Sequence, residues 1–221
     1  MKLSVVIPFY NEENMIQKMY DELVKEINQI TKAEFEIIFI NDGSKDRTFE
    51  KMLAIADSDS RVKYISFSRN FGKEAGTIAG LEYATGEAVI LMDGDLQHPP
   101  ALLPQMIEAY EQGYDVVSAR RTRTGEKPHR TFLAKHFYRL ANKMMDIELM
   151  DGVSEFRLFS RKAVRAILSL QEYNRFSKGI FSWIGFKEKV IEYENQVRTV
   201  GETKYSLKFS LNYAIQGILS F

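Results

Sequence analysis

The feature that most limits the fold of this chain is the alternation of two hydrophobic periods through residues 3–119. Short apolar runs typical of buried strands alternate with segments whose apolar residues recur every three or four positions, as on one helix face. Strand-like runs occupy residues 3–9, 35–40, 62–67, 88–92 and 114–119. Helix-like segments occupy residues 12–30, 45–56, 73–84 and 100–111. This order predicts right-handed crossovers and an α/β fold with a mainly parallel sheet flanked by helices.

The second half of the chain has a less regular pattern. It predicts strands near 153–159 and 191–197 and helices near 131–150 and 161–170. From Tyr205 onward apolar residues again recur on one side, flanked by Lys204 and Lys208, which predicts an amphipathic helix suited to an anionic interface. The sequence stops inside an apolar stretch at 218–221, which fits either a cut just before a membrane segment or a buried C-terminal helix.

Composition excludes several classes of protein. Thirty basic residues balance thirty acidic ones, whereas a general nucleic-acid binder usually carries a basic excess, so we expect no nucleic-acid partner. The chain has no cysteine, which excludes disulfide scaffolds, cysteine-based zinc sites and thiol catalysis. Apolar residues make up 45% of the sequence, enough to form a packed core.

Polar residues follow three of the predicted strands. They are Tyr10 to Glu12 after the first strand, Asp42 after the second, and Asp93 to Asp95 after the fourth. In an open parallel sheet, ligands bind outside the carboxyl ends of the strands. The sequence therefore predicts a ligand site at this edge.

Asp93 and Asp95 carry the sharpest chemical signal. Two carboxylates one residue apart, directly after an apolar strand, can approach one cation, and Mg²⁺ or Mn²⁺ prefers oxygen ligands shared with substrate phosphates. Gln97 could add an amide oxygen. The alternative is an ordinary acidic turn. His98 stands before two prolines, which favours a structural turn residue over a metal ligand.

Three further groups each allow two interpretations. Asp42 either accepts hydrogen bonds from a nucleotide or closes an Asx turn. Glu155, in a strand-like context, either pairs with Arg157 or takes part in catalysis, and the pattern alone favours the pair. The basic loop of residues 120–130 is either solvated or directs some of its arginines to phosphate oxygens.

Six segments together resemble glycosyltransferase family 2, the inverting enzymes of the GT-A fold. They are V-V-I-P-F-Y-N-E-E at 5–13, N-D-G-S-K-D-R-T at 41–48, F-S-R-N-F-G-K-E-A at 67–75, M-D-G-D-L-Q-H-P-P at 92–100, S-E-F-R-L at 154–158 and V-G-E-T-K-Y-S-L at 200–207. They span nearly the whole chain in the family's order. The nearest resemblance is to the polyprenyl-phosphate sugar transferases, which implies a Rossmann-like GT-A sheet followed by C-terminal amphipathic helices.

The resemblance also implies roles by position. The nucleotide would be bound by Pro8, Tyr10, Glu12, Asp42, Asp93, Gly94, Arg198 and Lys204. The metal, Mg²⁺ or Mn²⁺, would be held by Asp93, Asp95 and Gln97. The catalytic residues would be Asp95, Glu155 and Arg120, with Arg120, Arg198 and Lys204 contacting phosphates. The family commonly has Ala where this chain has Gly94, a change that we expect to be tolerated, and often Asp where this chain has Glu155.

The activity that the resemblance implies is transfer of a sugar from a nucleotide diphosphate to a polyprenyl phosphate, with inversion at the anomeric carbon. UDP-glucose or UDP-N-acetylglucosamine is favoured as donor, with GDP-mannose as the alternative. Residues 1–200 would form the catalytic domain and residues 201–221 a juxtamembrane helix, truncated before transmembrane helices. The protein would then act at the cytoplasmic membrane face, with self-assembly through the C-terminal region.

Rival functions remain open at this point. A soluble family 2 enzyme acting on a glycan hydroxyl would need a clear general base, and a non-catalytic nucleotide-sugar subunit would bind without turnover. A sugar-1-phosphate nucleotidyltransferase or a dinucleotide dehydrogenase would need a Gly-rich loop after the first strand, where this chain has P-F-Y-N-E-E.

Overall fold

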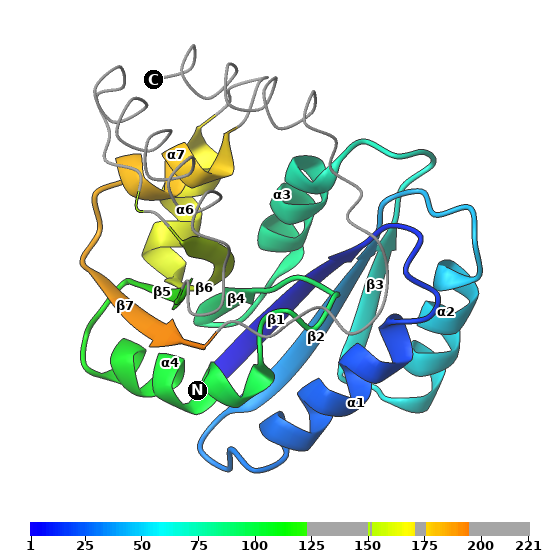
Figure 1. Cartoon of the computed structure of the whole chain (residues 1–221), viewed down its shortest axis with the longest axis horizontal. Coiled ribbons are helices and arrows are strands. Elements are labelled where there is room, and N and C mark those ends of the chain that lie inside the picture. The colour runs from blue at the N-terminus through cyan, green and yellow to red at the C-terminus, as the bar shows by residue number, and fades with distance from the viewer. Residues whose placement is uncertain (123–149, 151, 171–175, 195–221) are drawn as a thin grey trace.

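The computed structural model describes residues 1–122, 150, 152–170 and 176–194 (Figure 1). A seven-stranded sheet, in the order β3-β2-β1-β4-β6-β5-β7, forms the centre of the molecule. Its strands are β1 (Lys2–Phe9), β2 (Glu34–Asn41), β3 (Val62–Ser66), β4 (Ala88–Leu91), β5 (Val116–Arg121), β6 (Val153–Ser160) and β7 (Glu188–Tyr193). All the predicted strands within the described residues are therefore confirmed, with bounds shifted by a few positions.

Strand β6 is antiparallel to both of its neighbours, β4 and β5, and every other pairing in the sheet is parallel. The predicted mainly parallel sheet is confirmed. The strand–helix order did not indicate the insertion of β6 between β4 and β5. Its consequence is that the beginning of β6 lies at the same edge of the sheet as the end of β4.

Helices cover both faces of the sheet (Figure 1). One face carries α1 (Ile16–Ile27), α2 (Thr48–Ser58), the 3₁₀ turn η1 (Pro100–Leu102) and α4 (Leu103–Glu111). The other face carries α3 (Lys73–Tyr83), α6 (Arg161–Ser169) and α7 (Ser177–Trp183). The short α7 was not predicted. The helix expected over 131–150 and the one beginning near Tyr205 lie outside the described residues.

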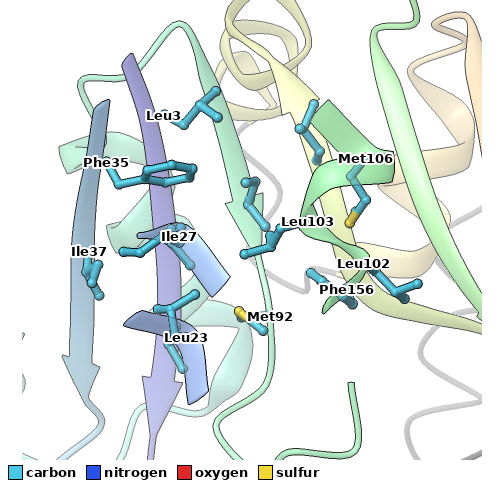
Figure 2. Packing of buried hydrophobic residues seen from close by; sticks show 14 of the residues in the cluster. Leu3, Leu23, Ile27, Phe35, Ile37, Met92, Leu102, Leu103, Met106 and Phe156 are labelled. Carbon is cyan, nitrogen blue, oxygen red and sulfur yellow. The ribbon is translucent and has the colours of Figure 1, made fainter. Parts of the chain in front are cut away.

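Alternating strand residues supply the two halves of the core. On the α1 side, Leu3, Phe35 and Ile37 pack with Leu23 and other apolar residues of the helices (Figure 2). On the α3 side, Val6, Ile38 and Val89 pack with residues of α3, α6 and α7. Burial on both sheet faces explains why the strands read as continuous apolar runs. In the described part of the chain, no helix has both the length and the apolar character needed to cross a bilayer.

Helix α3 lies unusually close to β1, because glycines face the strand. A β-carbon at Gly80 would lie only 2.1 Å from Cγ1 of Val6, and one at Gly76 would lie 3.4 Å from Cβ of Pro8. The lack of side chains at these two positions lets the helix backbone approach the sheet. This close approach brings Lys73, the first residue of α3, toward the carboxyl edge of the strands.

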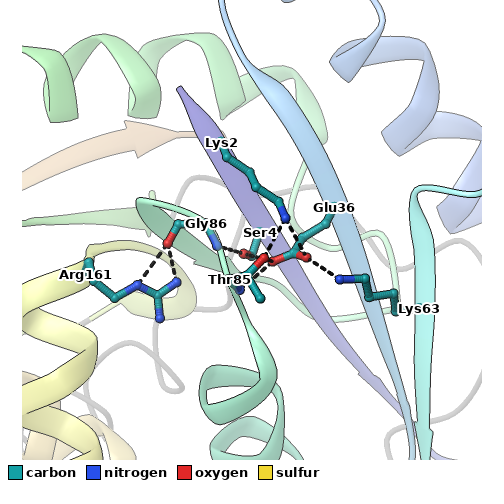
Figure 3. A network of polar contacts seen from close by, with 7 residues as sticks. All are labelled: Lys2, Ser4, Glu36, Lys63, Thr85, Gly86 and Arg161. Carbon is teal, nitrogen blue, oxygen red and sulfur yellow. Dashed lines mark hydrogen bonds and ion pairs between the residues drawn. The ribbon is translucent and has the colours of Figure 1, made fainter.

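At the opposite edge, Glu36 forms a buried polar network (Figure 3). Its carboxylate accepts hydrogen bonds from Oγ of Ser4 at 2.5 Å, from Nζ of Lys63 at 2.8 Å and from Oγ1 of Thr85 at 2.9 Å. Burial by itself would raise the pKa of Glu36, but the hydrogen bonds from Lys63, Ser4 and Thr85 outweigh it and hold this pKa well below its usual range. The network ties β1, β2, β3 and the segment before β4 together.

The depressed pKa of Glu36 predicts acid-sensitive stability. The ionised carboxylate stabilises the fold fully above its unfolded-state pKa of about 4.3, and this contribution is lost as the pH falls toward the lower folded-state value. Glu36→Gln keeps the shape but loses the charge that faces Lys63. We expect it to lower the free energy of unfolding at pH 7 by about 1–3 kcal/mol.

Urea unfolding at pH 7 and at pH 4 measures both effects. The variant should lose less stability than the wild type between the two pH values. Glu34→Gln, an exposed change on the same strand, is the matched control and should stay within about 0.5 kcal/mol of wild type. Equal stability of Glu36→Gln and wild type at pH 7 would contradict the assignment.

Candidate functional site

The register of β4 and β6 brings two carboxylates to the same place. The last pair of this antiparallel ladder is Leu91 with Arg157, so extending the register by two residues places Asp93 opposite Glu155. Asp93 was predicted at this edge from its position after a strand. Glu155 reaches the same edge because β6 runs in the opposite direction.

Lys73 bridges the two carboxylates. Its Nζ atom lies 2.5 Å from Oδ1 of Asp93 and 2.9 Å from Oε2 of Glu155. Burial by itself would lower the pKa of Lys73, but the charges of Asp93 and Glu155 outweigh it and raise this pKa well above its ordinary value. The three side chains therefore form an anion–cation–anion group at the end of the sheet.

His98 approaches Asp93 from the other side. Its Nε2 atom lies 3.4 Å from Oδ2 of Asp93, and its Nδ1 atom lies 2.6 Å from the hydroxyl oxygen of Tyr193 on β7. The imidazole is buried and contacts the Phe156 ring. Burial would raise the pKa of Asp93, but Lys73 and His98 together lower it, so the carboxylate is ionised. These contacts fit the structural interpretation of His98 that its sequence context favoured.

The turn that carries Asp95 has an uncommon backbone conformation. Leu96 has a φ of 57°, in the left-handed region, and Oδ1 of Asp95 accepts a hydrogen bond from the Gln97 N–H at 3.1 Å. Gly94 lies against Phe9, because a β-carbon there would fall 2.3 Å from Cε1 of that buried ring. Glycine stands here where the family commonly has alanine, and the Phe9 ring occupies the space that the alanine methyl group would need.

The residues at this edge fit a divalent cation that shares its ligands with a substrate. In the described part of the chain, no group of three or more His, Asp or Glu residues could hold a metal ion by itself. Mg²⁺ usually takes one or two carboxylates and completes its shell with water and substrate phosphates. Asp93 and Asp95 offer that donor set. The role of Gln97 as a metal ligand stays a prediction.

Asp42 holds the loop before α3. Its buried carboxylate accepts hydrogen bonds from the N–H groups of Phe71 at 2.7 Å and Gly72 at 3.0 Å. Burial raises the pKa of Asp42, and the two hydrogen bonds only partly oppose this effect. The Asx turn considered for Asp42 is not formed, because its carboxylate accepts from Phe71 and Gly72, and it is Oδ1 of Asn41 that accepts from the Ser44 N–H three residues on. The predicted contact of Asp42 with a nucleotide stays a prediction.

Glu12, a predicted nucleotide residue of the first loop, is tied to the start of α2. The N–H of Glu12 donates to Oγ1 of Thr48 at 2.8 Å, and the carbonyl of Glu12 accepts from Ile16, which is where α1 begins. The helix predicted over 12–30 therefore starts four positions later. Tyr10 precedes Asn11, which has a φ of 51°. These contacts fix the conformation of the first loop at the carboxyl edge of the sheet.

Pro8 sits where β1 continues beyond its neighbour. The pairing of β1 with β4 ends at Val6 and Leu91, and Met92 donates to the carbonyl of Val6. The backbone groups of residue 8, like those of residue 6, point toward β4. The N–H that Pro8 lacks would therefore lie beyond the paired part of β4. Proline is therefore tolerated in a central strand, and the sheet opens at this point.

Other predicted residues are not brought into the group. The Arg120 side chain is exposed and its Nη2 lies 3.4 Å from Oε1 of Glu192 on β7. The favoured pairing of Glu155 with Arg157 is wrong, because Glu155 contacts Lys73 while Nη1 of Arg157 lies 3.6 Å from Oε1 of Glu188. The two side chains share a sheet face, but α3 supplies the nearer cation. Arg198 and Lys204 lie outside the described residues.

Sequence reasoning missed Lys73 and Tyr193 as site residues. A signal for Lys73 was present, because a cation in the first turn of a helix interacts unfavourably with the helix dipole. A lysine at such a position indicates a role other than helix stability. Tyr193 gave no such signal. It belongs to the predicted late strand, and only the folded chain places its hydroxyl on His98.

A mainly parallel sheet flanked by helices, with two aspartates in the turn after β4, is the arrangement of the GT-A fold. The sequence profile described as glycosyl transferase family 2 matches residues 4–168. The chain therefore belongs to glycosyltransferase family 2, and it is a glycosyltransferase.

Relatives and solved structures agree with this membership. The Escherichia coli K12 prophage bactoprenol glucosyl transferase homolog is 43% identical over 222 residues, covering all of this chain and 72% of that protein. The Bacillus subtilis protein CsbB, named as a glycosyltransferase, is 50% identical over 99% of this chain and 66% of its own length. A Mycobacterium tuberculosis glucosyl-3-phosphoglycerate synthase, solved with Mn²⁺ and UDP-glucose, is 17% identical and matches the fold with a TM-score of 0.62. That match covers 98% of this chain and 76% of the synthase chain.

The role of Asp42 in fixing the start of α3 is testable. Asp42→Asn leaves one acceptor oxygen for two N–H donors and turns an amide group toward the other donor. We expect a loss of about 1–3 kcal/mol in the free energy of unfolding. Faster hydrogen exchange at the Phe71 and Gly72 amides should accompany this loss. Asp57→Asn, an exposed change in α2, is the control, and unchanged exchange at both amides would contradict this role.

Proposed function

We propose that this protein transfers a sugar, with glucose favoured, from a uridine diphosphate to a polyprenyl phosphate, with inversion at the anomeric carbon. The observation that carries the proposal is the pair of carboxylates, Asp93 and Asp95, in the turn after β4 of a GT-A sheet. Support for the acceptor comes from full-length similarity of this chain to proteins named bactoprenol glucosyl transferase, in Escherichia coli and in Shigella phages.

Asp93 and Asp95, with Gln97, would hold Mg²⁺ or Mn²⁺ together with the diphosphate of the donor. The cation would neutralise the negative charge that develops on the departing nucleotide diphosphate. The chain's own task is to orient these oxygen atoms. The Gln97 N–H fixes Asp95, and Lys73 and His98 fix Asp93, so both carboxylates are held before the donor arrives.

Glu155 would orient the acceptor rather than remove a proton from it. A phosphate monoester is largely ionised near neutral pH, since its second pKa is about 6, so the attacking oxygen needs no strong base. Glu155 lies opposite Asp93 and is only 16% exposed, held by Lys73. Arg120, Arg198 and Lys204 would contact phosphates, and Pro8, Tyr10, Glu12 and Asp42 would line the nucleoside side.

We further propose that residues 1–200 form the catalytic domain and that residues 201–221 place it at the cytoplasmic face of a membrane. A polyprenyl acceptor is embedded in the bilayer, so its phosphate is reached at the surface. The curated relatives continue beyond the length of this chain, which covers 66% of CsbB and 72% of the Escherichia coli protein.

The proposed role of Asp95 predicts loss of turnover when its charge is removed. We expect Asp95→Asn to lower the rate by about a hundredfold or more, because charge on the leaving diphosphate is no longer neutralised. The measurement is release of UDP from UDP-glucose with Mn²⁺ and undecaprenyl phosphate. Asp57→Asn is the charge-matched control on an exposed helix position, and a variant at residue 95 with wild-type turnover would remove the metal assignment.

The same assay separates the proposed acceptor from the alternatives. UDP release should depend on the lipid phosphate. Release that is driven by a glycan hydroxyl acceptor and is indifferent to polyprenyl phosphate would favour the soluble-enzyme alternative. Donor binding with no release under any acceptor would favour a non-catalytic subunit.

A single displacement predicts the stereochemistry of the product. An α-linked sugar nucleotide should give a β-linked sugar phosphate, because the acceptor attacks the face opposite the leaving group. The coupling constant of the anomeric proton in the purified product measures the configuration. A product with the donor's configuration would rule out this mechanism.

A further inference from the structure

The ammonium group of Lys73 lies between two carboxylates. It contacts Asp93 at 2.5 Å and Glu155 at 2.9 Å, and the three side chains are between 16% and 32% exposed. Asp93, which provides the shorter contact, is also the residue proposed to hold the divalent ion. Lys73 and the proposed divalent ion would therefore bind the same carboxylate.

The position of Lys73 is set by the fold rather than by a flexible surface loop. It is the first residue of α3, directly after Gly72, whose N–H is held by the buried Asp42 carboxylate. Gly76 and Gly80 let the same helix pack closely against β1. The start of the helix is thus anchored on two sides, while the ammonium group of Lys73 sits at the end of a flexible side chain.

Both oxygen atoms of Asp93 already have a positively polarised neighbour. Oδ1 faces Lys73, and Oδ2 faces His98 at 3.4 Å. His98 is buried and its second nitrogen is engaged by Tyr193, so its ring is held in place. Lys73 can give up Asp93 and keep Glu155, which makes Lys73 the neighbour that can yield.

We propose that Lys73 is a resident counter-ion that competes with the divalent cation for Asp93 and so makes metal binding depend on the donor. Without the donor, a divalent ion at Asp93 meets the nearby ammonium charge and binds weakly. When the donor arrives, its diphosphate supplies negative charge beside both cations, and the repulsion is offset. The inference rests on the proposed metal-dependent transfer, and it assigns Lys73 a positioning role that the sequence comparison did not give.

The coupling between metal and donor must be reciprocal, since it is a free energy shared between two sites. The donor should raise the affinity for Mn²⁺ by the same factor by which Mn²⁺ raises the affinity for the donor. Removing the ammonium charge should strengthen Mn²⁺ binding in the absence of donor and reduce this factor. A purely structural role for Lys73 would weaken Mn²⁺ binding instead.

The test is a titration of the full chain with Mn²⁺ alone, followed by electron paramagnetic resonance of the free ion, and repeated with UDP-glucose. Lys73→Met should bind Mn²⁺ about tenfold more tightly than wild type without the nucleotide, the scale expected for removing a unit charge close to the ion. Lys73→Arg keeps the charge and should stay near wild type. Lys18→Met, the same substitution at an exposed position of α1, is the matched control and should also match wild type.

An unchanged or weaker donor-free affinity in Lys73→Met would overturn the inference. If that variant does not fold, Lys73→Gln gives the same comparison, because its amide can contact both carboxylates without the charge. The proposed function fails separately, if the wild type binds no Mn²⁺ even with UDP-glucose present. Donor-dependent Mn²⁺ binding in wild type with no gain in Lys73→Met or Lys73→Gln would overturn only the role of Lys73.

Discussion

The site depends on the contact of one ammonium group with two carboxylates. Lys73 joins α3 to the turn after β4, through Asp93, and to β6, through Glu155. Two adjacent carboxylates would repel each other and disfavour this arrangement, so the interposed cation is what allows them to share one edge of the sheet. Asp42, Gly76 and Gly80 take part in the same arrangement indirectly, because they fix the helix that carries the cation.

The two edges of the sheet handle buried charge in different ways. At the amino edge, the Glu36 carboxylate has its hydrogen bonds supplied by Ser4, Thr85 and Lys63, and the Glu36 side chain is 4% exposed. Its role is to hold strands together. At the carboxyl edge, the Asp93 side chain keeps 25% of its surface exposed, and its cationic partner has a second carboxylate to turn to. The first arrangement suits stability, whereas the second suits exchange with a ligand.

This division agrees with membership of glycosyltransferase family 2. The GT-A sheet places the residues proposed to bind the nucleotide after β1 and β2 and the carboxylate turn after β4, so in the proposed reaction donor and metal would meet at one edge. An antiparallel β6 then brings a third carboxylate, Glu155, opposite Asp93, which is proposed to hold the metal. In the proposed reaction the nucleophile is already charged, so positions of groups matter more than proton transfer. His98 and the Gln97 N–H accordingly hold Asp93 and Asp95 in place, whereas Lys73 is the partner proposed to yield.

The sequence by itself determined the strands, most of the helices, the mainly parallel sheet and the edge to which Asp42 and Asp93 belong. These follow from local periodicity and from the rule that polar turns end buried strands. Only the tertiary structure decided that Lys73 rather than Arg157 pairs with Glu155, that His98 and Tyr193 support Asp93, and that Asp42 holds the start of α3. Periodicity reports which face a side chain occupies. Which distant side chains meet depends on the place of β6 in the sheet and on how closely α3 approaches β1, and no local pattern contains either quantity.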